Sequence, residues 1–286
     1  MAGFITKITA FFLTIASFFL TLFGLPGYPT GDEVDMSKFT LTFAEEFDGN
    51  SVDYSVWQQG WEGSGITMVR KGGYWNSKMA SVSDGCLHIA TKYYKNGILN
   101  DGKAGWYTTA LETRGKFEQR YGYYEVRCIL PKGAGLWSAF WMMCGEVGNI
   151  DGSGKDGSEL DIFESPFYSE YTDVVSSAVH YDGYDDAHKQ KTICKTHVYG
   201  SNPYEEFNTY GMEWNENEYI FYINGKECGR SDFGGVCRET GYVILSVEVG
   251  GNNAVPGESW AGDSIDTNST APTDFIVDYV RVYQYK

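Results

Sequence analysis

Apolar and polar residues alternate with a period of two through most of the chain after residue 35. Successive side chains of a strand point to opposite faces, so this pattern is typical of strands with one buried face. The predicted strands are 39–43, 86–90, 122–130, 137–143, 159–164, 174–181, 208–214, 218–223, 242–249 and 274–285. Asp84-Gly85 and Asn224-Gly225 have the residue types of tight hairpin turns. The pattern therefore predicts an all-β sandwich of two antiparallel sheets.

The first 30 residues follow a different pattern. Residues 8–25 carry no charge, and Lys7 is the only cation before them. This run predicts a secretory signal peptide, but its length also borders on that of a membrane-spanning helix. We therefore expect 1–30 to be a signal peptide or an N-terminal membrane anchor, with a lipid-modified leader as a further alternative. Residues 36–286 are expected to form one domain of a secreted or cell-surface-anchored protein.

The formal net charge of the chain is −16, from 22 basic and 38 acidic residues. This excess of acid argues against nucleic acid or an anionic membrane surface as a partner. It is compatible with a neutral sugar polymer. Aromatic residues make up 16% of the chain, and we expect most of them in the core and a minority along a ligand groove.

The six cysteines permit up to three disulfides in an exported chain. No C-x-x-C motif occurs, so nothing in the sequence supports a zinc or thioredoxin-type site. Cys128 lies on the apolar side of a predicted strand and is expected to be a buried free thiol. Cys228 and Cys237 flank a glycine-rich turn and are the favoured pair, with the other pairings left open.

Three carboxylates lie close together in the predicted strand 159–164, namely Glu159, Asp161 and Glu164. Strict alternation would point Glu164 into the core, where an unpaired carboxylate costs several kcal/mol. One extra residue near 162 or 163, a β-bulge, would return Glu164 to the side of the other two acids. Glycoside hydrolysis requires such a set, one carboxylate as nucleophile or base and one carboxylic acid as proton donor. The alternatives are a solvated acidic face or a calcium site.

The sequence around these acids resembles glycoside hydrolase family 16, the β-jelly-roll laminarinase and lichenase group. Glu159-Leu-Asp-Ile-Phe-Glu164 resembles the bulged E-[IL]-D-[IV]-x-E signature of the laminarinase-like branch. Further blocks follow in the family's order: 43–48, 114–127, 135–142 and 277–283. The resemblance covers nearly all of the exported chain and implies a jelly-roll sandwich of two curved antiparallel sheets with a concave substrate groove.

The resemblance also implies roles for individual residues. Glu159 would be the nucleophile, Asp161 the assisting residue and Glu164 the general acid/base of a retaining mechanism. The substrate-binding candidates are Trp137, Trp141, Arg114, His180 and Trp260. Trp137 is the better stacking candidate, whereas Trp141 could equally belong to the core. Arg114 could instead form a structural salt bridge, and His180 could be a strand histidine with its bonds satisfied.

Many members of the family hold a structural Ca²⁺ far from the active site. Its ligands would here be the carbonyls of Glu46 and Gly85 and the carboxylate of Asp278, an all-oxygen set that suits calcium. No cofactor is expected for catalysis. Departures from the family pattern at Glu248, at 165–168 and in the long charged loop 182–203 leave the exact substrate open.

The sequence thus predicts a monomeric, retaining endo-β-glycanase acting on β-1,3-glucan or mixed-linkage β-1,3/1,4-glucan. One alternative keeps the fold and mechanism but has a galactan substrate such as agarose, porphyran or carrageenan. A second alternative is a non-catalytic glucan-binding protein.

Overall fold

The structure is a computed structural model, and it describes residues 12–17, 20, 22, 23, 25–61, 65–133, 135–166, 173–250 and 273–286. Residues 12–17 are helical, and two short 3-10 helices follow, η1 (Met36–Lys38) and η2 (Ser77–Met79). None of the described helices is long and apolar enough to cross a membrane. Most of the predicted leader falls outside the described residues, so its nature stays a prediction.

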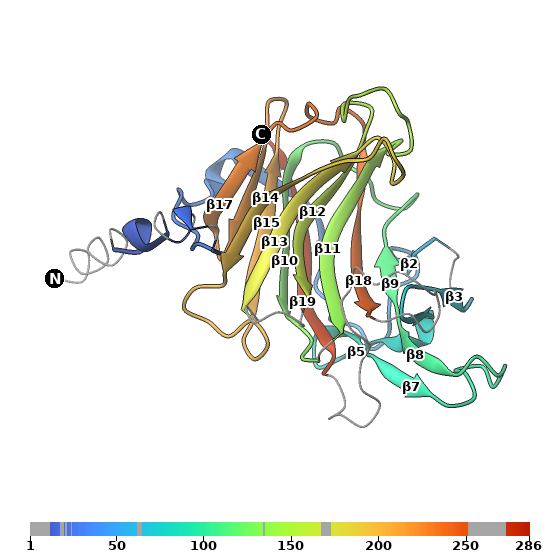
Figure 1. Cartoon of the computed structure of the whole chain (residues 1–286). Helices are drawn as coiled ribbons and strands as arrows, with labels where there is room; N and C mark the ends of the chain where they lie inside the picture. Colours follow the sequence, from blue (N-terminus) through green and yellow to red (C-terminus); the bar gives the residue numbers. More distant parts are fainter. Residues whose placement is uncertain are drawn as a thin grey trace.

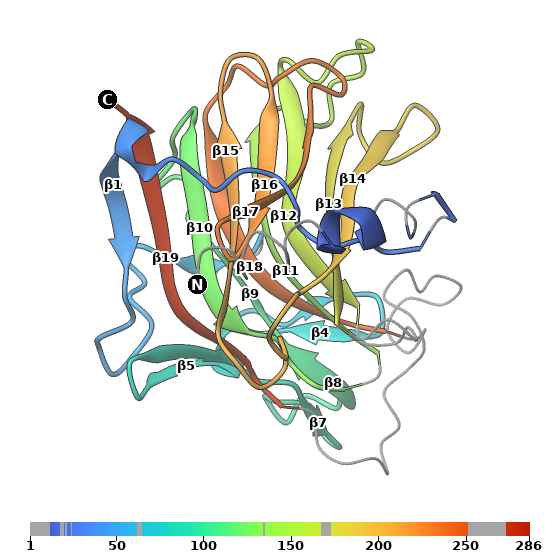
Figure 2. The same cartoon turned by 90° about the vertical axis from the view of Figure 1, so that its left-hand side faces the viewer.

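One face of the molecule is a large antiparallel sheet with β1 paired to β19 and the order β17-β16-β15-β10-β19-β6-β5 (Figures 1 and 2). Its strands are β1 (Phe39–Glu45), β5 (Ala80–Ser83), β6 (Cys86–Ile89), β10 (Gly122–Ile129), β15 (Asn208–Trp214), β16 (Tyr219–Ile223), β17 (Lys226–Ser231) and β19 (Phe275–Tyr285). Asn224 and Gly225, at φ 50° and 73°, form the predicted tight turn between β16 and β17.

The second sheet packs against the first in the order β14-β13-β12-β11-β18-β9-β2. Its strands are β2 (Gln58–Gln59), β9 (Ala110–Glu112), β11 (Leu136–Gly145), β12 (Gly157–Pro166), β13 (Val174–Tyr181), β14 (Lys189–His197) and β18 (Gly241–Val249). A small third sheet, β3-β4-β8-β7, comprises β3 (Met68–Val69), β4 (Gly73–Trp75), β7 (Lys92–Tyr94) and β8 (Gly105–Thr108). Figure 1 shows the long strands of the two large sheets curving together.

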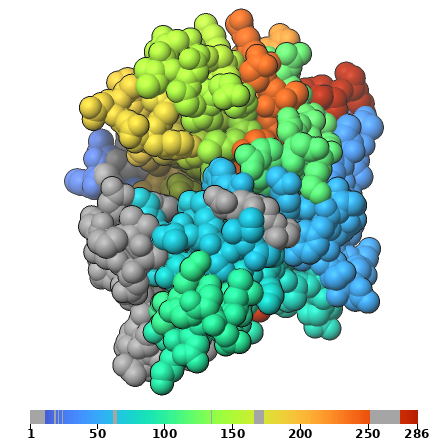
Figure 3. Space-filling view, turned by 90° about the vertical axis from the view of Figure 1, so that its right-hand side faces the viewer, coloured from blue at the N-terminus to red at the C-terminus, as the bar shows by residue number. Residues whose placement is uncertain are grey.

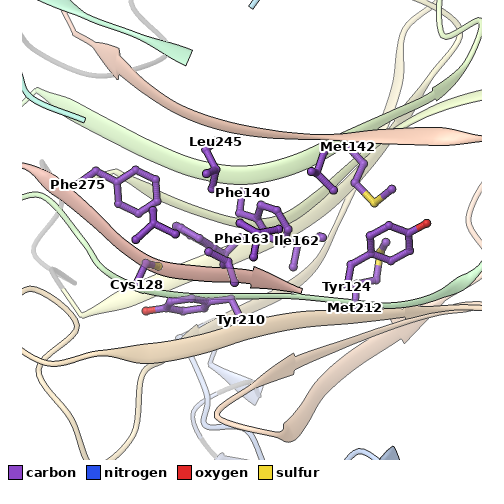
Figure 4. Packing of buried hydrophobic residues seen from close by; sticks show 14 of the residues in the cluster. Tyr124, Cys128, Phe140, Met142, Ile162, Phe163, Tyr210, Met212, Leu245 and Phe275 are labelled. Atoms are coloured by element: carbon purple, nitrogen blue, oxygen red, sulfur yellow. The ribbon is translucent and has the colours of Figure 1, made fainter. Parts of the chain in front are cut away.

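The core lies between the two large sheets and is built from the inward side chains of both (Figure 4). Phe163 of β12 packs on Tyr210 of β15, with ring centroids 4.3 Å apart, and meets Phe275 of β19 edge-on. Because these aromatic rings join the two sheets, they fix which face of β12 is turned away from the core. That outward face is the one on which the acids lie.

All ten predicted strands are present, with ends that differ by a few residues. The prediction of a long loop at 182–203 is wrong, since β14 occupies Lys189–His197 within it. The high lysine content concealed this strand, whose buried positions are Cys194 and Thr196. Lysine is well suited to a strand at the edge of a sheet, where charge discourages pairing with another chain.

The predicted Cys228–Cys237 disulfide is also wrong, because all six cysteines, each within the described chain, are free thiols. Cys228 on β17 instead contacts Cys194 on β14, and Cys237 contacts Cys144 at the end of β11. The turn after β17 carries the chain from one sheet to the other, which separates Cys228 from Cys237. Cys128 is a fully buried free thiol, as predicted.

Candidate active site

A β-bulge in β12 places all three acids on one face of the second sheet. Asp161 pairs with Trp141 of β11, and Phe163 pairs with the preceding Phe140, so Ile162 has no partner. The pairing with β13 is interrupted over the same residues. Both Ile162 and Phe163 therefore point into the core, where they are 2% and 0% exposed. The bulge required by the sequence is confirmed, and it lies at Ile162.

Neighbouring strands supply the residues beside each acid. Glu159 pairs with Met143 and His180, Asp161 with Trp141 and Ala178, and Glu164 with Ala139 and Ser176. Directly opposed residues of an antiparallel pair share a face, so these side chains form one surface turned away from the sandwich core. The acids thus stand in the middle of a sheet, with strands on both sides.

Glu164 is positioned by Trp137, whose indole Nε1–H donates a 2.9 Å hydrogen bond to Glu164 Oε1. Burial raises the pKa of Glu164 well above its ordinary value, and the charges of Asp161 and Glu159 raise it further. The bond from Trp137 opposes this rise only in part. Burial and the neighbouring carboxylates therefore favour the protonated form of Glu164, which is the form that a proton donor requires.

Glu159 has more partners that favour its charged form. Tyr184 donates a short hydrogen bond to Glu159 Oε2, and His180 Nε2 lies 4.0 Å from Glu159 Oε1. Burial and the charge of Asp161 raise the pKa of Glu159 to about 7, while His180, Tyr184 and Arg70 hold it down. At Glu164 the groups that oppose the rise in pKa are Trp137 and His180, so the two carboxyl groups lie in different surroundings. Such a difference is how one site provides both a nucleophile and an acid.

Asp161 lies between the glutamates along β12 and close to His180. Asp161 Oδ2 is 3.0 Å from His180 Nε2, and burial raises the pKa of Asp161 above its ordinary range. His180 Nδ1 is in turn 2.9 Å from His188 Nε2, with the two rings stacked. One ligand atom each of Glu159, Asp161 and His180 lies within 4.8 Å of the others. Protons in a group this compact are shared rather than assigned to single residues.

An aromatic cluster covers the same face beside the acids. Trp61 stacks on Trp75 at 5.1 Å and meets Trp141 at 5.7 Å. Trp141 donates from Nε1 to Ser246 Oγ and is half-buried in this cluster, so it belongs to the outer face and not to the sandwich core. Figure 3 shows this side of the molecule, with a recess between the lime-to-yellow segments and the cyan segment that includes residues 65–80. Flat indole surfaces beside paired carboxylates are suited to stacking on sugar rings.

Two arginines reach this face. Arg114 forms a 2.9 Å ion pair with the buried Glu112 and lies 5.9 Å from the ring of Tyr242. The structural salt bridge considered for Arg114 is therefore present, although its side chain stays 40% exposed. Arg70 binds Glu248 and stacks on Trp75, with its guanidinium carbon 4.0 Å from the ring centroid.

The remaining predicted residues lie elsewhere. Trp260 is outside the described residues. Glu46 accepts two 2.8 Å bonds from Arg281, and Asp278 Oδ2 accepts a 2.5 Å bond from Arg127. Gly85 lies in the turn between β5 and β6 at φ +71°. The pKa of the adjacent Cys86 is raised by burial and, to a smaller extent, by the charge of Asp278. A calcium ion at Asp278 would have to compete with Arg127, so these residues fit the ion only in part, and the calcium site stays a prediction.

Sequence reasoning missed Tyr184, His188 and Arg70. Tyr184 and His188 lie between β13 and β14, where no motif marks them, and only the loop as a whole had been noted. Arg70 lies just before β4, in a segment that has no block of the family signature. All three lie in connections between strands, and the path of such a connection depends on the tertiary fold and not on a local sequence pattern.

These features define the class of protein as a jelly-roll β-sandwich with a carboxylate-bearing outer face. The chain belongs to glycoside hydrolase family 16, because the sequence model described as "Beta-porphyranase A-D, GH16 domain" matches residues 39–285. The family resemblance is thus confirmed.

Individual relatives agree with this assignment. The chain is 27% identical over 207 residues to the endo-1,3-1,4-beta-glycanase EglC of Rhizobium meliloti (strain 1021), covering 71% of this chain and 39% of the relative. It therefore spans about two fifths of the length of the first such relatives. It is 27% identical to a beta-glucanase of Rhodothermus marinus, covering 86% and 85% of the two chains. The laminarinase catalytic domain of Thermotoga maritima superimposes with a TM-score of 0.69 at 26% identity, over 87% of this chain and 99% of that one.

Proposed function

We propose that the protein is a retaining endo-β-glycanase that hydrolyses β-1,3-glucan or mixed-linkage β-1,3/1,4-glucan. The observation that carries the proposal is the row of carboxylates on β12. Tyr184 donates a hydrogen bond to Glu159, Trp137 donates one to Glu164, and burial raises the pKa of both carboxyl groups. Two carboxyl groups on one face, each held by a different donor, are suited to serve as nucleophile and acid in double displacement at a sugar carbon.

In the first step, ionised Glu159 attacks the anomeric carbon and forms a covalent ester. The glycosidic C–O bond breaks, and the proton of Glu164 passes to the departing oxygen. In the second step, Glu164 takes a proton from water, whose oxygen attacks the same carbon and releases Glu159. The anomeric configuration is inverted twice and so retained. Asp161, whose Oδ2 lies 3.0 Å from His180 Nε2, tunes the charge of Glu159.

The glucan substrate is supported by the relatives, whose names refer to glucanase, glycanase and laminarinase activities. The acidic balance of the chain, 38 acidic against 22 basic residues, also suits a neutral polymer. The galactan alternative has one specific observation in its favour, the description of the matching family model as a β-porphyranase domain.

A panel of laminarin, barley β-glucan, agarose and porphyran tests the substrate. We expect reducing oligosaccharides of several lengths from one or both glucans. Products from a galactan alone would favour the alternative, and a folded protein that releases nothing from either glucan would refute the proposal. Absence of products combined with tight laminarin binding would instead indicate the non-catalytic protein.

The roles of the two glutamates are tested by azide rescue. A small anion can replace a missing carboxylate, so Glu159→Ala with azide should yield the α-glycosyl azide, whereas Glu164→Ala should yield the β-glycosyl azide. The same stereochemistry from both variants would contradict the assignment.

We further propose that the protein acts outside the cell or at its surface, on the basis of the uncharged run 8–25. Fractionation of the producing cells, with N-terminal sequencing of the recovered protein, tests this point.

A further inference from the structure

Arg70 and Glu248 form a buried ion pair on the outer face, beside the acids. Glu248 Oε1 accepts a 2.7 Å hydrogen bond from Arg70 Nε and a second, shorter bond from Arg70 Nη2. Their side chains are 4% and 23% exposed, respectively. Glu248 Oε2 is buried and has no hydrogen-bond partner among the described residues. A carboxylate this buried is retained only with a compensating charge beside it.

The strand register places this pair next to the catalytic surface. Glu248 lies directly opposite Trp137, whose indole holds Glu164. Ser246, two residues earlier on β18, lies opposite Ala139, which in turn pairs with Glu164. Glu248 therefore shares the outer face with the acids, one step further along the strands, while Val247 and Val249 belong to the core.

Arg70 is held in place from several sides. Its guanidinium lies 4.0 Å from the ring centroid of Trp75 and 5.2 Å from that of Trp61. The Trp75 indole is fixed by a 2.9 Å bond to the Val247 carbonyl, and Gly72 N donates to the Val249 carbonyl at 2.9 Å. The charge of Arg70 also acts on Glu159, where it helps to hold the carboxyl pKa down. The pair is therefore rigid and electrostatically coupled to the site.

We propose that the Arg70–Glu248 pair is a specificity element that makes the adjoining sugar subsite select an uncharged sugar over one bearing a sulfate or carboxylate group. The inference rests on the proposed glycanase function. A lone arginine stacked on indole rings would attract an anionic substituent, because guanidinium binds such groups through paired N–H donors. Glu248 already occupies two of those donors and cancels the charge, which leaves a polar but neutral surface for hydroxyl groups.

The charge argument predicts a defined pattern across four proteins. Glu248→Gln keeps the shape of the side chain and leaves the positive charge of Arg70 uncompensated. Arg70→Gln removes the compensating charge, so the buried Glu248 takes up a proton, and this variant is neutral like the double variant. Each is made in a Glu159→Gln background so that binding is measured without turnover. Dissociation constants are determined for laminarin oligosaccharides and for the same oligosaccharides after chemical sulfation.

We expect Glu248→Gln to lower the ratio of the sulfated to the neutral dissociation constant by about tenfold or more at low ionic strength. Arg70→Gln and the double variant should both keep this ratio within about threefold of the starting protein, because neither leaves an uncompensated charge. The matched control is Glu213→Gln, which removes a buried carboxylate from β15 in the other sheet, 4% exposed and bonded to Tyr222 and Tyr285. It should leave the ratio unchanged. Thermal unfolding of every variant confirms that the fold is intact.

Failure of this inference is distinguishable from failure of the proposed function. If the wild type cleaves laminarin but the ratio stays within about twofold in Glu248→Gln, or falls equally in Glu213→Gln, the specificity role is overturned and the glucanase function stands. If the wild type cleaves only galactans, the glucan assignment fails. The ratio is then taken from porphyran and agarose oligosaccharides, where an unchanged value in Glu248→Gln again overturns the inference.

Discussion

Tyr184 donates a hydrogen bond to Glu159, and its removal should be visible in the pH dependence of catalysis. Tyr184→Phe deletes one O–H donor and keeps the ring, which is 55% exposed. The bond favours the charged carboxylate, since it lowers the pKa of Glu159 from the higher value that burial alone would set. Without it, the pKa of Glu159 should rise above its present value of about 7.

The size of the change follows from the energy of the bond. A hydrogen bond to a charged group contributes roughly 1.5–3 kcal/mol, and one pH unit corresponds to about 1.4 kcal/mol. The full range is thus about one to two pH units. Because Tyr184 is largely exposed, water can replace its hydroxyl in part, so we expect a rise of about one pH unit.

The assay is the dependence of kcat/KM on pH with laminarin, from about pH 5 to about pH 10. The acidic limb of this profile reports the ionisation of the nucleophile in the free enzyme, as an apparent value for the coupled carboxyl groups. It should move upward in Tyr184→Phe while the plateau changes little. Tyr93→Phe on β7 removes the hydroxyl of a tyrosine that is 47% exposed and lies away from the acids, and it serves as control. A limb that stays within about 0.3 pH units, or moves downward, would refute the role assigned to Tyr184.

Three other predictions concern different parts of the molecule. Trp137→Phe removes the donor that lowers the pKa of Glu164, so the basic limb of the kcat/KM profile should move to higher pH, and a downward movement would contradict this. Burial raises the pKa of Glu159 from 4.5 to about 7, so the folded state binds this proton more tightly and loses about 3–4 kcal/mol of stability as pH rises across that range. Glu159→Gln should therefore unfold at a higher temperature than the wild type at pH 8 and at a similar temperature at pH 4; equal differences at both would exclude this cause. Mild oxidation should join Cys194 to Cys228, and peptide mapping that finds Cys228 in any other pairing would contradict the contact.

The sequence carried enough information for the fold and for the row of acids. Alternation identified the long strands, because each has one face in the core. Strict alternation of side chains would have buried Glu164 at a high cost in free energy. This conflict was enough to predict a bulge near 162 or 163 from the sequence. The motif also singled out Trp137 and His180, and the structure places both beside the acids, although their roles in sugar binding are not yet tested.

What the sequence did not reveal depends on contacts between distant segments. Arg70 and Glu248 are 178 residues apart and meet only because the segment before β4 folds over the end of β18. Tyr184 reaches Glu159 from a connection between strands whose path no local pattern fixes. The cysteine pairing failed for a similar reason, because nearness in sequence was taken for nearness in space across a turn that changes sheets.

Because of the bulge at Ile162, β12 contains one residue more than its pairing with β11 requires. On both sides of the bulge β12 keeps an antiparallel register with β11, and only the one residue between them is left over. Loss of that residue would shorten the spacing between Asp161 and Glu164 yet leave all three acids on the outer face, with Phe163 still facing the core. A change of a single codon could therefore alter the spacing of the catalytic groups without refolding the sheet, and this position is the natural place for insertion and deletion in the evolution of the site.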